Sequence, residues 1–116
     1  MTRKGKIQTV KGIIEPKDLG MTMTHEHVFI EFPSTMNIPP EESHKKQVYN
    51  EPLSLKNRGL IYHHGWSNSD DRKIVNFDIS VKEIQKYKAA GGGAVVDATS
   101  IGIARDPEGL LKVSNL

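Results

Sequence analysis

Hydrophobic and polar residues alternate over short runs near the start of the chain, as is typical of β-strands. The runs 7–10 and 13–14 are rich in isoleucine and valine and lie on either side of Gly12, which predicts a short β-hairpin. A turn is expected at 16–20, where Pro16 fixes φ and Gly20 permits a positive φ. Residues 21–30 then form an extended run of β-branched, aromatic and methionine side chains, which predicts a further strand.

Residues 33–71 have a different character. They contain Pro39, Pro40 and Pro52 among scattered asparagines and serines, and neither the strand period nor the helix period is sustained. A poorly patterned stretch of this length inside a compact domain is usually functional or disordered. We therefore expect a long strand-to-helix loop over 33–71, with at most short helical turns.

Regular periodicity returns at Ser80. Ser80 and Glu83 have the S-x-x-E spacing of a capping box, in which each side chain satisfies a backbone donor at the start of a helix. The apolar stripe that follows consists of Val81, Ile84 and Tyr87. Gly91 stands where the end of a helix is expected, so the pattern predicts a helix from Ser80 to about this glycine.

A second strand and a second helix are predicted after this helix. The glycines at 91–93 lead into the apolar run 94–99, which is typical of a buried strand. Asp106 followed by Pro107 is typical of the N-cap and the first position of a helix. The order strand, long loop, helix, strand, helix predicts an α/β protein that begins a repeated strand–helix unit with a parallel sheet.

Composition and charge narrow the classes of partner. The 116 residues allow one small domain or part of a larger one. The net charge is +2 with acids and bases interspersed, which argues against a nucleic-acid partner. No run approaches the roughly 20 apolar residues that span a bilayer, and the basic start is not followed by a secretory segment. We therefore expect no membrane partner and a cytoplasmic location, while no pattern predicts an oligomeric state.

The run His25-Glu26-His27 is the strongest candidate for chemistry. In a strand, alternate side chains share a face, so both imidazoles point the same way and can reach one metal ion. Because the chain has no cysteine, a metal here must use nitrogen and oxygen ligands. The alternative is that one histidine is buried and hydrogen-bonded while the other faces solvent. The spacing alone leaves both interpretations open.

A cupin is a second interpretation of the same residues. Gly20, His25, His27 and Glu31 nearly match the first cupin motif, in which two histidines and a glutamate bind a single metal ion. The spacing from Gly20 to His25 is one residue too short for that motif. Cupins are also all-β, whereas a helix is predicted from Ser80.

Asp97 is a carboxylate within an otherwise apolar strand. It shares one face with Val95 and Thr99, and a carboxylate in such a strand must be paired, hydrogen-bonded or close to a metal. Two roles remain open for this residue: that of a purely structural aspartate, and that of an aspartate that supports a metal ligand through a hydrogen bond. The remaining histidines, His44, His63 and His64, lie in the irregular region, where exposed side chains are the expectation.

The chain resembles the phosphotriesterase family of the amidohydrolase superfamily, and more closely its phosphotriesterase-related branch, found in animals. The residues that carry the resemblance are the runs 19–27 (LGMTMTHEH) and 91–107 (GGGAVVDATSIGIARDP). The runs 5–10, 14–16, 51–52 and 56–57 also match that branch. The resemblance covers nearly the whole chain and is weakest at about 34–50.

The resemblance implies a fold and a metal centre. Residues 1–116 are expected to be the incomplete N-terminal part of one metallohydrolase domain, comprising a hairpin and the first two strand–helix units of a (β/α)8 barrel. His25 and His27 match the family's ligands to the more buried of two metal ions, which are typically zinc. Asp97 falls on the second strand. The other ligands of the family come from later strands, so they lie outside these residues.

The resemblance also implies a chemistry. A hydroxide shared by the two ions would attack an ester, lactone, phosphotriester or small N-acyl amide such as an N-acyltaurine, a small-molecule substrate in each case. The loop at 33–71 would determine specificity, with Tyr62 and Trp66 as pocket walls. No catalytic residue is expected within this chain, which alone should be inactive. If the natural product ends at Leu116, the alternative is a non-catalytic chain with weak metal or partner binding.

Overall fold

The computed structural model describes residues 3–36, 38–64 and 68–116. The chain begins with an antiparallel hairpin of β1 (Ile7–Thr9) and β2 (Gly12–Ile14), as the alternation predicted. Gly12 has a φ of +124°, a value that suits glycine, and the Thr9 hydroxyl donates to its carbonyl oxygen at 2.8 Å. A 3-10 turn, η1 (Pro16–Asp18), then leads away from the hairpin.

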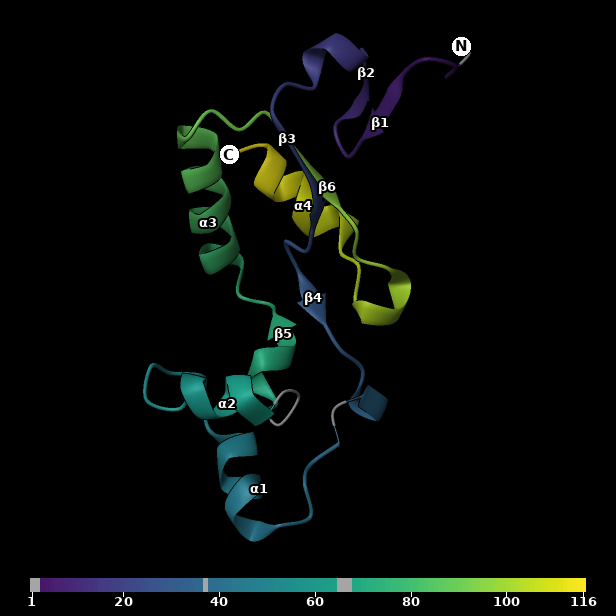
Figure 1. Cartoon of the computed structure of the whole chain (residues 1–116). Coiled ribbons are helices and arrows are strands. Elements are labelled where there is room, and N and C mark those ends of the chain that lie inside the picture. The colour runs from purple at the N-terminus through teal and green to yellow at the C-terminus, as the bar shows by residue number, and fades with distance from the viewer. Residues whose placement is uncertain (1–2, 37, 65–67) are drawn as a thin grey trace.

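Two strands that are far apart in sequence form the centre of the molecule. β3 (Thr22–Glu26) pairs in parallel with β6 (Ala94–Asp97), with Thr22 opposite Ala94 and Met23 opposite Val95 (Figure 1). The helix α3 (Phe77–Ala89) precedes β6, and α4 (Pro107–Ser114) follows it. This arrangement is two successive strand–helix units lying side by side, and it confirms the predicted parallel sheet.

A small apolar core joins the two units. Val28 and Phe29, which follow β3, pack against Val113 of α4. The partly buried side chains around them come from α3, β6 and α4; they are Val81, Ile84, Val95 and Leu110. Two of the three residues of the predicted apolar stripe, Val81 and Ile84, thus face this core, as an amphipathic helix requires. The third, Tyr87, donates its hydroxyl to the Met21 carbonyl at 2.7 Å.

The start of α3 corrects one prediction. The helix begins at Phe77, three residues before Ser80, and its N-cap is Asn76, whose side-chain oxygen accepts from the Ile79 amide at 3.1 Å. The capping box predicted at Ser80 and Glu83 is therefore wrong. Ser80 lies one turn inside the helix, buried, and its hydroxyl donates to the Val28 carbonyl at 2.8 Å. Asparagine is as good an N-cap residue as serine, so Asn76 can begin the helix. The hydrogen bond to the buried Val28 carbonyl explains why a serine stands at position 80.

The entry to β6 depends on glycine. Gly91 has a φ of +97° just after α3 ends, as a glycine at the end of a helix often does. A Cβ atom on Gly93 would lie 2.8 Å from the Leu19 carbonyl oxygen and 3.1 Å from the Cα of Gly20. The chain leading into β6 therefore approaches the chain leading into β3 more closely than a side chain would allow.

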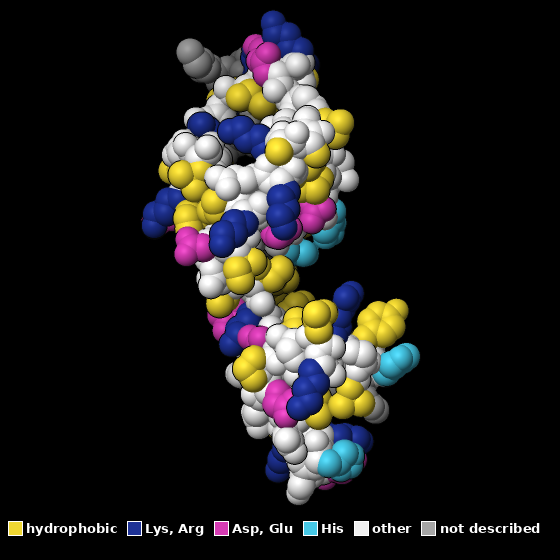
Figure 2. Space-filling model, turned by 90° about the vertical axis from the view of Figure 1, so that its left-hand side faces the viewer, with side chains coloured by type: hydrophobic (Ala, Val, Ile, Leu, Met, Phe, Trp, Pro, Cys, Tyr) yellow, Lys and Arg dark blue, Asp and Glu magenta, His cyan; other side chains and the backbone are white. Residues whose placement is uncertain are grey.

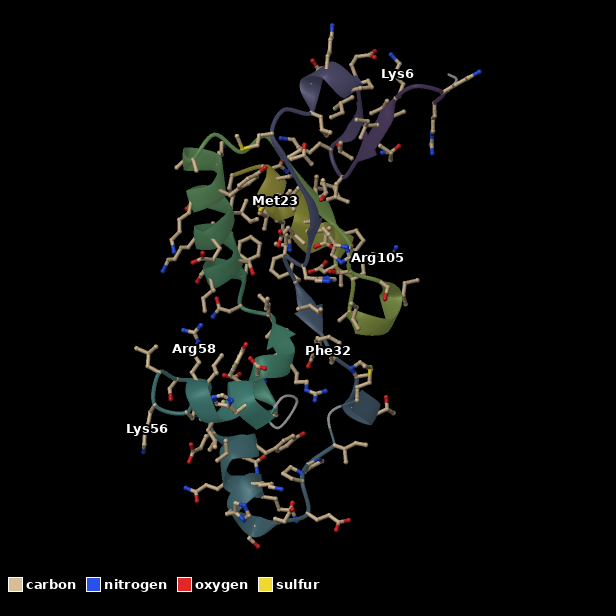
Figure 3. The ribbon with its side chains drawn as sticks, viewed as in Figure 1. Lys6, Met23, Phe32, Lys56, Arg58 and Arg105 are labelled. Atoms are coloured by element: carbon tan, nitrogen blue, oxygen red, sulfur yellow. The ribbon has the colours of Figure 1, made fainter. Side chains whose placement is uncertain are left out.

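The predicted long loop is a lobe with helices of its own. It is bounded by β4 (Ile30–Glu31) and β5 (Lys73–Ile74), which pair antiparallel, and Phe32 marks the point where the chain leaves β4 (Figure 3). We call residues 32–72 the lobe. Its elements are η2 (Ser34–Met36), α1 (Ser43–Asn50), α2 (Arg58–His64) and η3 (Asp70–Arg72). The prediction of at most short helical turns was wrong for α1 and α2.

Buried hydrogen bonds hold the lobe together, which explains why no hydrophobic period is visible in its sequence. Asn68 has an exposed fraction of 0%. Its amide nitrogen donates to the carbonyl oxygens of Val48 at 2.6 Å and Glu51 at 2.8 Å. Its side-chain oxygen accepts from the amides of Asp70 and Asp71, each at 2.9 Å. One side chain therefore provides hydrogen-bond partners for backbone groups at both the end of α1 and the start of η3.

Replacing Asn68 by alanine is expected to destabilise the lobe by about 3 kcal/mol, because it leaves several backbone groups without their partner inside the protein. Urea denaturation of the complete gene product, followed by tryptophan fluorescence, measures this loss. The matched control is Asn50→Ala, since Asn50 is exposed and its side chain donates to one carbonyl, that of Lys46. Equal and small changes in the two variants would contradict the role given to Asn68.

The molecule is extended for its length. Its radius of gyration is 17.6 Å and its extents are 58 × 29 × 21 Å, whereas a compact domain of this size has a radius of about 13 Å. Large apolar side chains stand exposed at several places along the chain; examples are Met21 at 64%, Val96 at 48% and Ile101 at 80%. The two central strands therefore have the open form of part of a barrel rather than of a closed domain. Within residues 3–36, 38–64 and 68–116, no helix is long and apolar enough to cross a membrane.

Candidate metal centre

The two histidines lie together at the carboxyl end of β3. His25 is exposed in the last part of the strand, and His27, which is half-buried, follows immediately after the strand ends at Glu26. Their ring centroids are 5.4 Å apart and the ring planes are inclined by 76°. The strand spacing therefore places both imidazoles beside one another, as predicted.

This separation fits two ligands of one metal ion. Zn–N bonds of about 2.0–2.1 Å in tetrahedral geometry place two imidazole centroids roughly 5 Å apart. The measured 5.4 Å is close to that value. Imidazole nitrogens are also the ligands that zinc and other borderline-soft ions accept. The residues present thus fit part of a metal site.

His27 is held from behind by Thr99. The Nδ1 atom of His27 is 2.9 Å from the Thr99 hydroxyl oxygen, and that hydroxyl is 3.1 Å from the Phe29 carbonyl oxygen. Thr99 follows β6 and is 4% exposed, so its contact with Phe29 is buried and its contact with His27 is partly buried. The strand pattern places Thr99 on one face with Asp97 but predicts no role for it. The contact links segments 72 residues apart, and no local pattern predicts it.

Asp97 ties the ends of the two strands together. One carboxylate oxygen accepts from the Val28 amide at 2.9 Å, and the other accepts from the Thr99 amide at 2.9 Å. The Ala98 amide also donates to the Glu26 carbonyl at 2.9 Å and continues the pairing of the two segments. Both oxygens of Asp97 are therefore engaged by backbone donors, so this carboxylate holds the segment that carries His27.

The histidine pair can offer at most two side chains to a metal ion. Among the described residues, no group of three or more His, Cys, Asp or Glu side chains is placed to hold one. Catalytic zinc sites usually take three protein ligands and keep one open position. A catalytic zinc ion at this pair would therefore need ligands in addition to these two histidines.

The chain matches a known family along nearly its whole length. A model of the phosphotriesterase family matches residues 5–115. The chain belongs to the phosphotriesterase family. The parallel strands β3 and β6 with the intervening helix α3 are incompatible with the all-β cupin fold, so the cupin interpretation is wrong.

Relatives within the phosphotriesterase family come from distant organisms. The chain is 33% identical to the N-acetyltaurine hydrolase of Dictyostelium discoideum, over 97% of this chain and 35% of that protein. It is 35% identical to the N-acetyltaurine hydrolase of Homo sapiens, over 95% of this chain and 31% of that protein. The chain therefore spans about a third of the length of the curated relatives it matches.

Solved structures confirm the fold. The resiniferatoxin-binding protein from Rhodobacter sphaeroides superposes with a TM-score of 0.89 at 30% identity, over 97% of this chain and 31% of that one. A double mutant of the organophosphorus hydrolase from Deinococcus radiodurans gives a TM-score of 0.57 at 25% identity, over 96% and 25% respectively. The chain thus has the fold of the N-terminal part of a phosphotriesterase-family (β/α)8 barrel.

The predicted pocket walls belong to the lobe. Tyr62 lies on α2 with an exposed fraction of 83%, and its ring stands edge-on to that of His63 at 5.7 Å. Trp66 lies outside the described residues. The lobe extends beyond the carboxyl end of β3, where phosphotriesterase-family barrels carry their active sites (Figure 1). Figure 2 shows histidine side chains on both the strand-bearing part and the lobe, on one side of the molecule.

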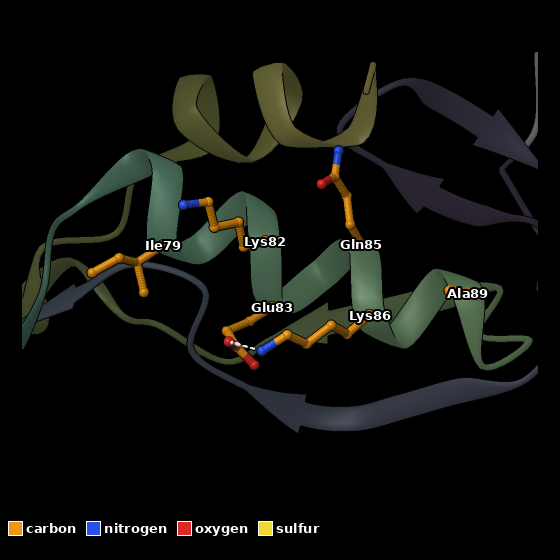
Figure 4. A pocket seen from close by; sticks show the side chains of 6 residues that line it. All are labelled: Ile79, Lys82, Glu83, Gln85, Lys86 and Ala89. Carbon is orange, nitrogen blue, oxygen red and sulfur yellow. Dashed lines mark hydrogen bonds and ion pairs between the residues drawn. The ribbon is translucent and has the colours of Figure 1, made fainter.

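A shallow pocket on α3 is separate from the histidine pair. Its lining combines apolar, charged and amide side chains of one helix; the residues are Ile79, Lys82, Glu83, Gln85, Lys86 and Ala89 (Figure 4). Glu83 and Lys86 form an ion pair of 2.7 Å within it. The pocket lies on the helix surface rather than at the ends of the strands, and it contains neither histidine.

Proposed function

We propose that this chain supplies the first two ligands, His25 and His27, of a binuclear zinc hydrolase that cleaves a small N-acyl amide such as N-acetyltaurine. The ring separation of 5.4 Å at the carboxyl end of the first barrel strand is the observation that carries the proposal. Its support from relatives is the shared name N-acetyltaurine hydrolase in organisms as distant as Dictyostelium discoideum and Homo sapiens.

The chemistry assigns separate tasks to the metal and to this chain. When bound, the zinc ions supply Lewis acidity at the scissile carbonyl and a nucleophile at neutral pH. His25 and His27 would hold one ion through ring nitrogens, and Asp97 fixes the backbone that carries His27. Hydrolysis breaks the amide C–N bond, adds the oxygen of water to the acyl carbon and leaves a protonated amine.

The lobe is the part of this chain suited to choose the substrate. It rises from the strand end that carries the histidines, and loops at this end determine substrate choice in (β/α)8 barrels. Tyr62 presents an exposed aromatic face on the lobe. We assign Tyr62 and Trp66 to the walls of a pocket for one small molecule.

Incubation of the complete gene product with N-acetyltaurine tests the proposed reaction. We expect acetate and taurine in equal amounts, loss of turnover with a chelator and recovery with zinc. N-Ethylacetamide, which lacks the sulfonate, and a phosphotriester serve as comparison substrates. Faster turnover of the phosphotriester would overturn the substrate class, and turnover that persists without metal would overturn the mechanism.

The 116-residue polypeptide alone is expected to show no metal-dependent turnover of these substrates. The histidine pair falls short of the three protein ligands of a catalytic zinc site, and no larger ligand group occurs among the described residues. The assay is the same product analysis, at micromolar protein with added zinc. Zinc-dependent hydrolysis by the polypeptide that His25→Ala abolishes would contradict this prediction, because it would show that the polypeptide holds a complete site. The same result would exclude the interpretation of the polypeptide as a non-catalytic chain.

A further inference from the structure

We propose that Thr99 is a positioning residue that fixes His27 in the tautomer with its proton on Nδ1, so that Nε2 is the atom offered to the metal. The role toward the metal rests on the proposed function, whereas the tautomer itself follows from the hydrogen bonds. Thr99 is not adjacent to the histidine in sequence, and its side chain is buried beneath it.

The direction of the hydrogen bonds follows from the atoms involved. A threonine hydroxyl has one proton to donate and lone pairs that accept. The Phe29 carbonyl oxygen, 3.1 Å away, can only accept, so the hydroxyl proton points to it. Toward His27 the hydroxyl must then act as acceptor, at 2.9 Å. The proton of that bond therefore sits on Nδ1 of His27.

The consequence lies on the other side of the ring. A neutral imidazole with its proton on Nδ1 carries its free lone pair on Nε2, and a metal ion binds the nitrogen that lacks the proton. Proteins usually orient a histidine ligand through a hydrogen bond that the N–H of its second ring nitrogen donates to a neighbouring acceptor. Here the acceptor is a hydroxyl rather than a carboxylate.

Thr99 is itself held in place. Its amide donates to Asp97 at 2.9 Å, and the other oxygen of Asp97 accepts from the Val28 amide, the residue after His27. These bonds close a ring of contacts around the end of β3. Threonine is also β-branched, so its χ1 angle is restricted and its hydroxyl is fixed in direction. The orienting group is therefore as well fixed as the ligand it orients.

Two substitutions separate orientation of His27 from simple packing. Thr99→Val keeps the shape and removes the hydroxyl, whereas Thr99→Ser keeps the hydroxyl and removes the methyl group. In the complete gene product we expect Thr99→Val to weaken zinc binding by about 10–100-fold in a competition titration with a chelator. Thr99→Ser should retain zinc affinity within about threefold, and equal losses in the two variants would overturn the proposal.

The tautomer is read directly from the ring nitrogens by ¹⁵N NMR of the metal-free protein. The wild type and Thr99→Ser should show His27 with its proton on Nδ1, and Thr99→Val should shift it toward the Nε2 tautomer. A wild-type spectrum with the proton on Nε2 would overturn the proposal even if the valine variant did not fold. Because this spectrum needs no metal, an Nδ1 tautomer in a protein that binds no zinc would refute the proposed function and leave the tautomer standing.

Discussion

Replacing both His25 and His27 by alanine in the complete gene product is expected to remove the metal ion they bind and to lower kcat/KM at least about a thousandfold. Metal ions contribute several kcal/mol of transition-state stabilisation in such hydrolases, and each 1.4 kcal/mol corresponds to about tenfold in rate. Both side chains lie at one strand end with ring centroids 5.4 Å apart. The double replacement therefore removes every ligand that this strand end is proposed to give the ion. Elemental analysis and product assays on the same preparation measure the two losses.

The matched control replaces His44 and His63, which are exposed on α1 and α2 of the lobe. That variant should keep its metal content, and any change in rate should be confined to substrate binding. If the variant lacking His25 and His27 still contains two metal ions per chain, the assignment of these residues as ligands is wrong. Circular dichroism of each variant shows whether a loss of metal merely follows a loss of structure.

The isolated 116-residue chain is expected to be unfolded, molten or aggregated rather than stably folded. Among the described residues, β3 and β6 are the two strands of its central sheet, and a parallel pair has no local hairpin to hold it together. The open strand edges invite association with other chains. Exposed apolar side chains such as Met21 and Val96 show how little hydrophobic gain offsets the chain entropy.

Denaturation of the monomeric chain by urea, followed by circular dichroism, measures this stability. We expect a shallow, non-cooperative loss of signal, with little change on adding zinc, because an incomplete site adds little binding energy to folding. A cooperative transition with several kcal/mol of stability would show instead that these residues form a self-sufficient domain. Binding of a hydrophobic dye distinguishes a molten chain from an unfolded one.

The sequence predicted those features that depend on local pattern. Alternation, turn residues and caps predicted the hairpin, the strand that leads to the histidine pair, the second strand and the helix capped by Asp106. The strand predicted over 21–30 is shorter than expected, because it ends at Glu26, just before His27. The H-x-H spacing also predicted that both rings lie on one side of the strand end, and their separation agrees. Local rules were sufficient wherever neighbouring residues determine the backbone.

Features that depend on distant contacts could not be predicted. The start of α3 was misplaced because Asn76 and Ser80 both suit a helix start, and the buried Val28 carbonyl that accepts from Ser80 is not visible in the local sequence. The helix α1 was missed because hydrogen bonds of Asn68, which join its end to the start of η3, rather than an apolar stripe, hold it in place. The role of Thr99 depends on a contact between two strand ends and could be found only in the folded chain.

X-ray diffraction of the zinc-loaded complete gene product at the zinc absorption edge tests the central claim most directly, because anomalous scattering locates the metal itself. The account predicts a zinc peak about 2.0–2.1 Å from Nε2 of His27 and at a bonding distance from a ring nitrogen of His25. A second peak should lie about 3.5–4 Å from the first. Fully occupied zinc bound elsewhere, with both histidines free of it, would contradict the account.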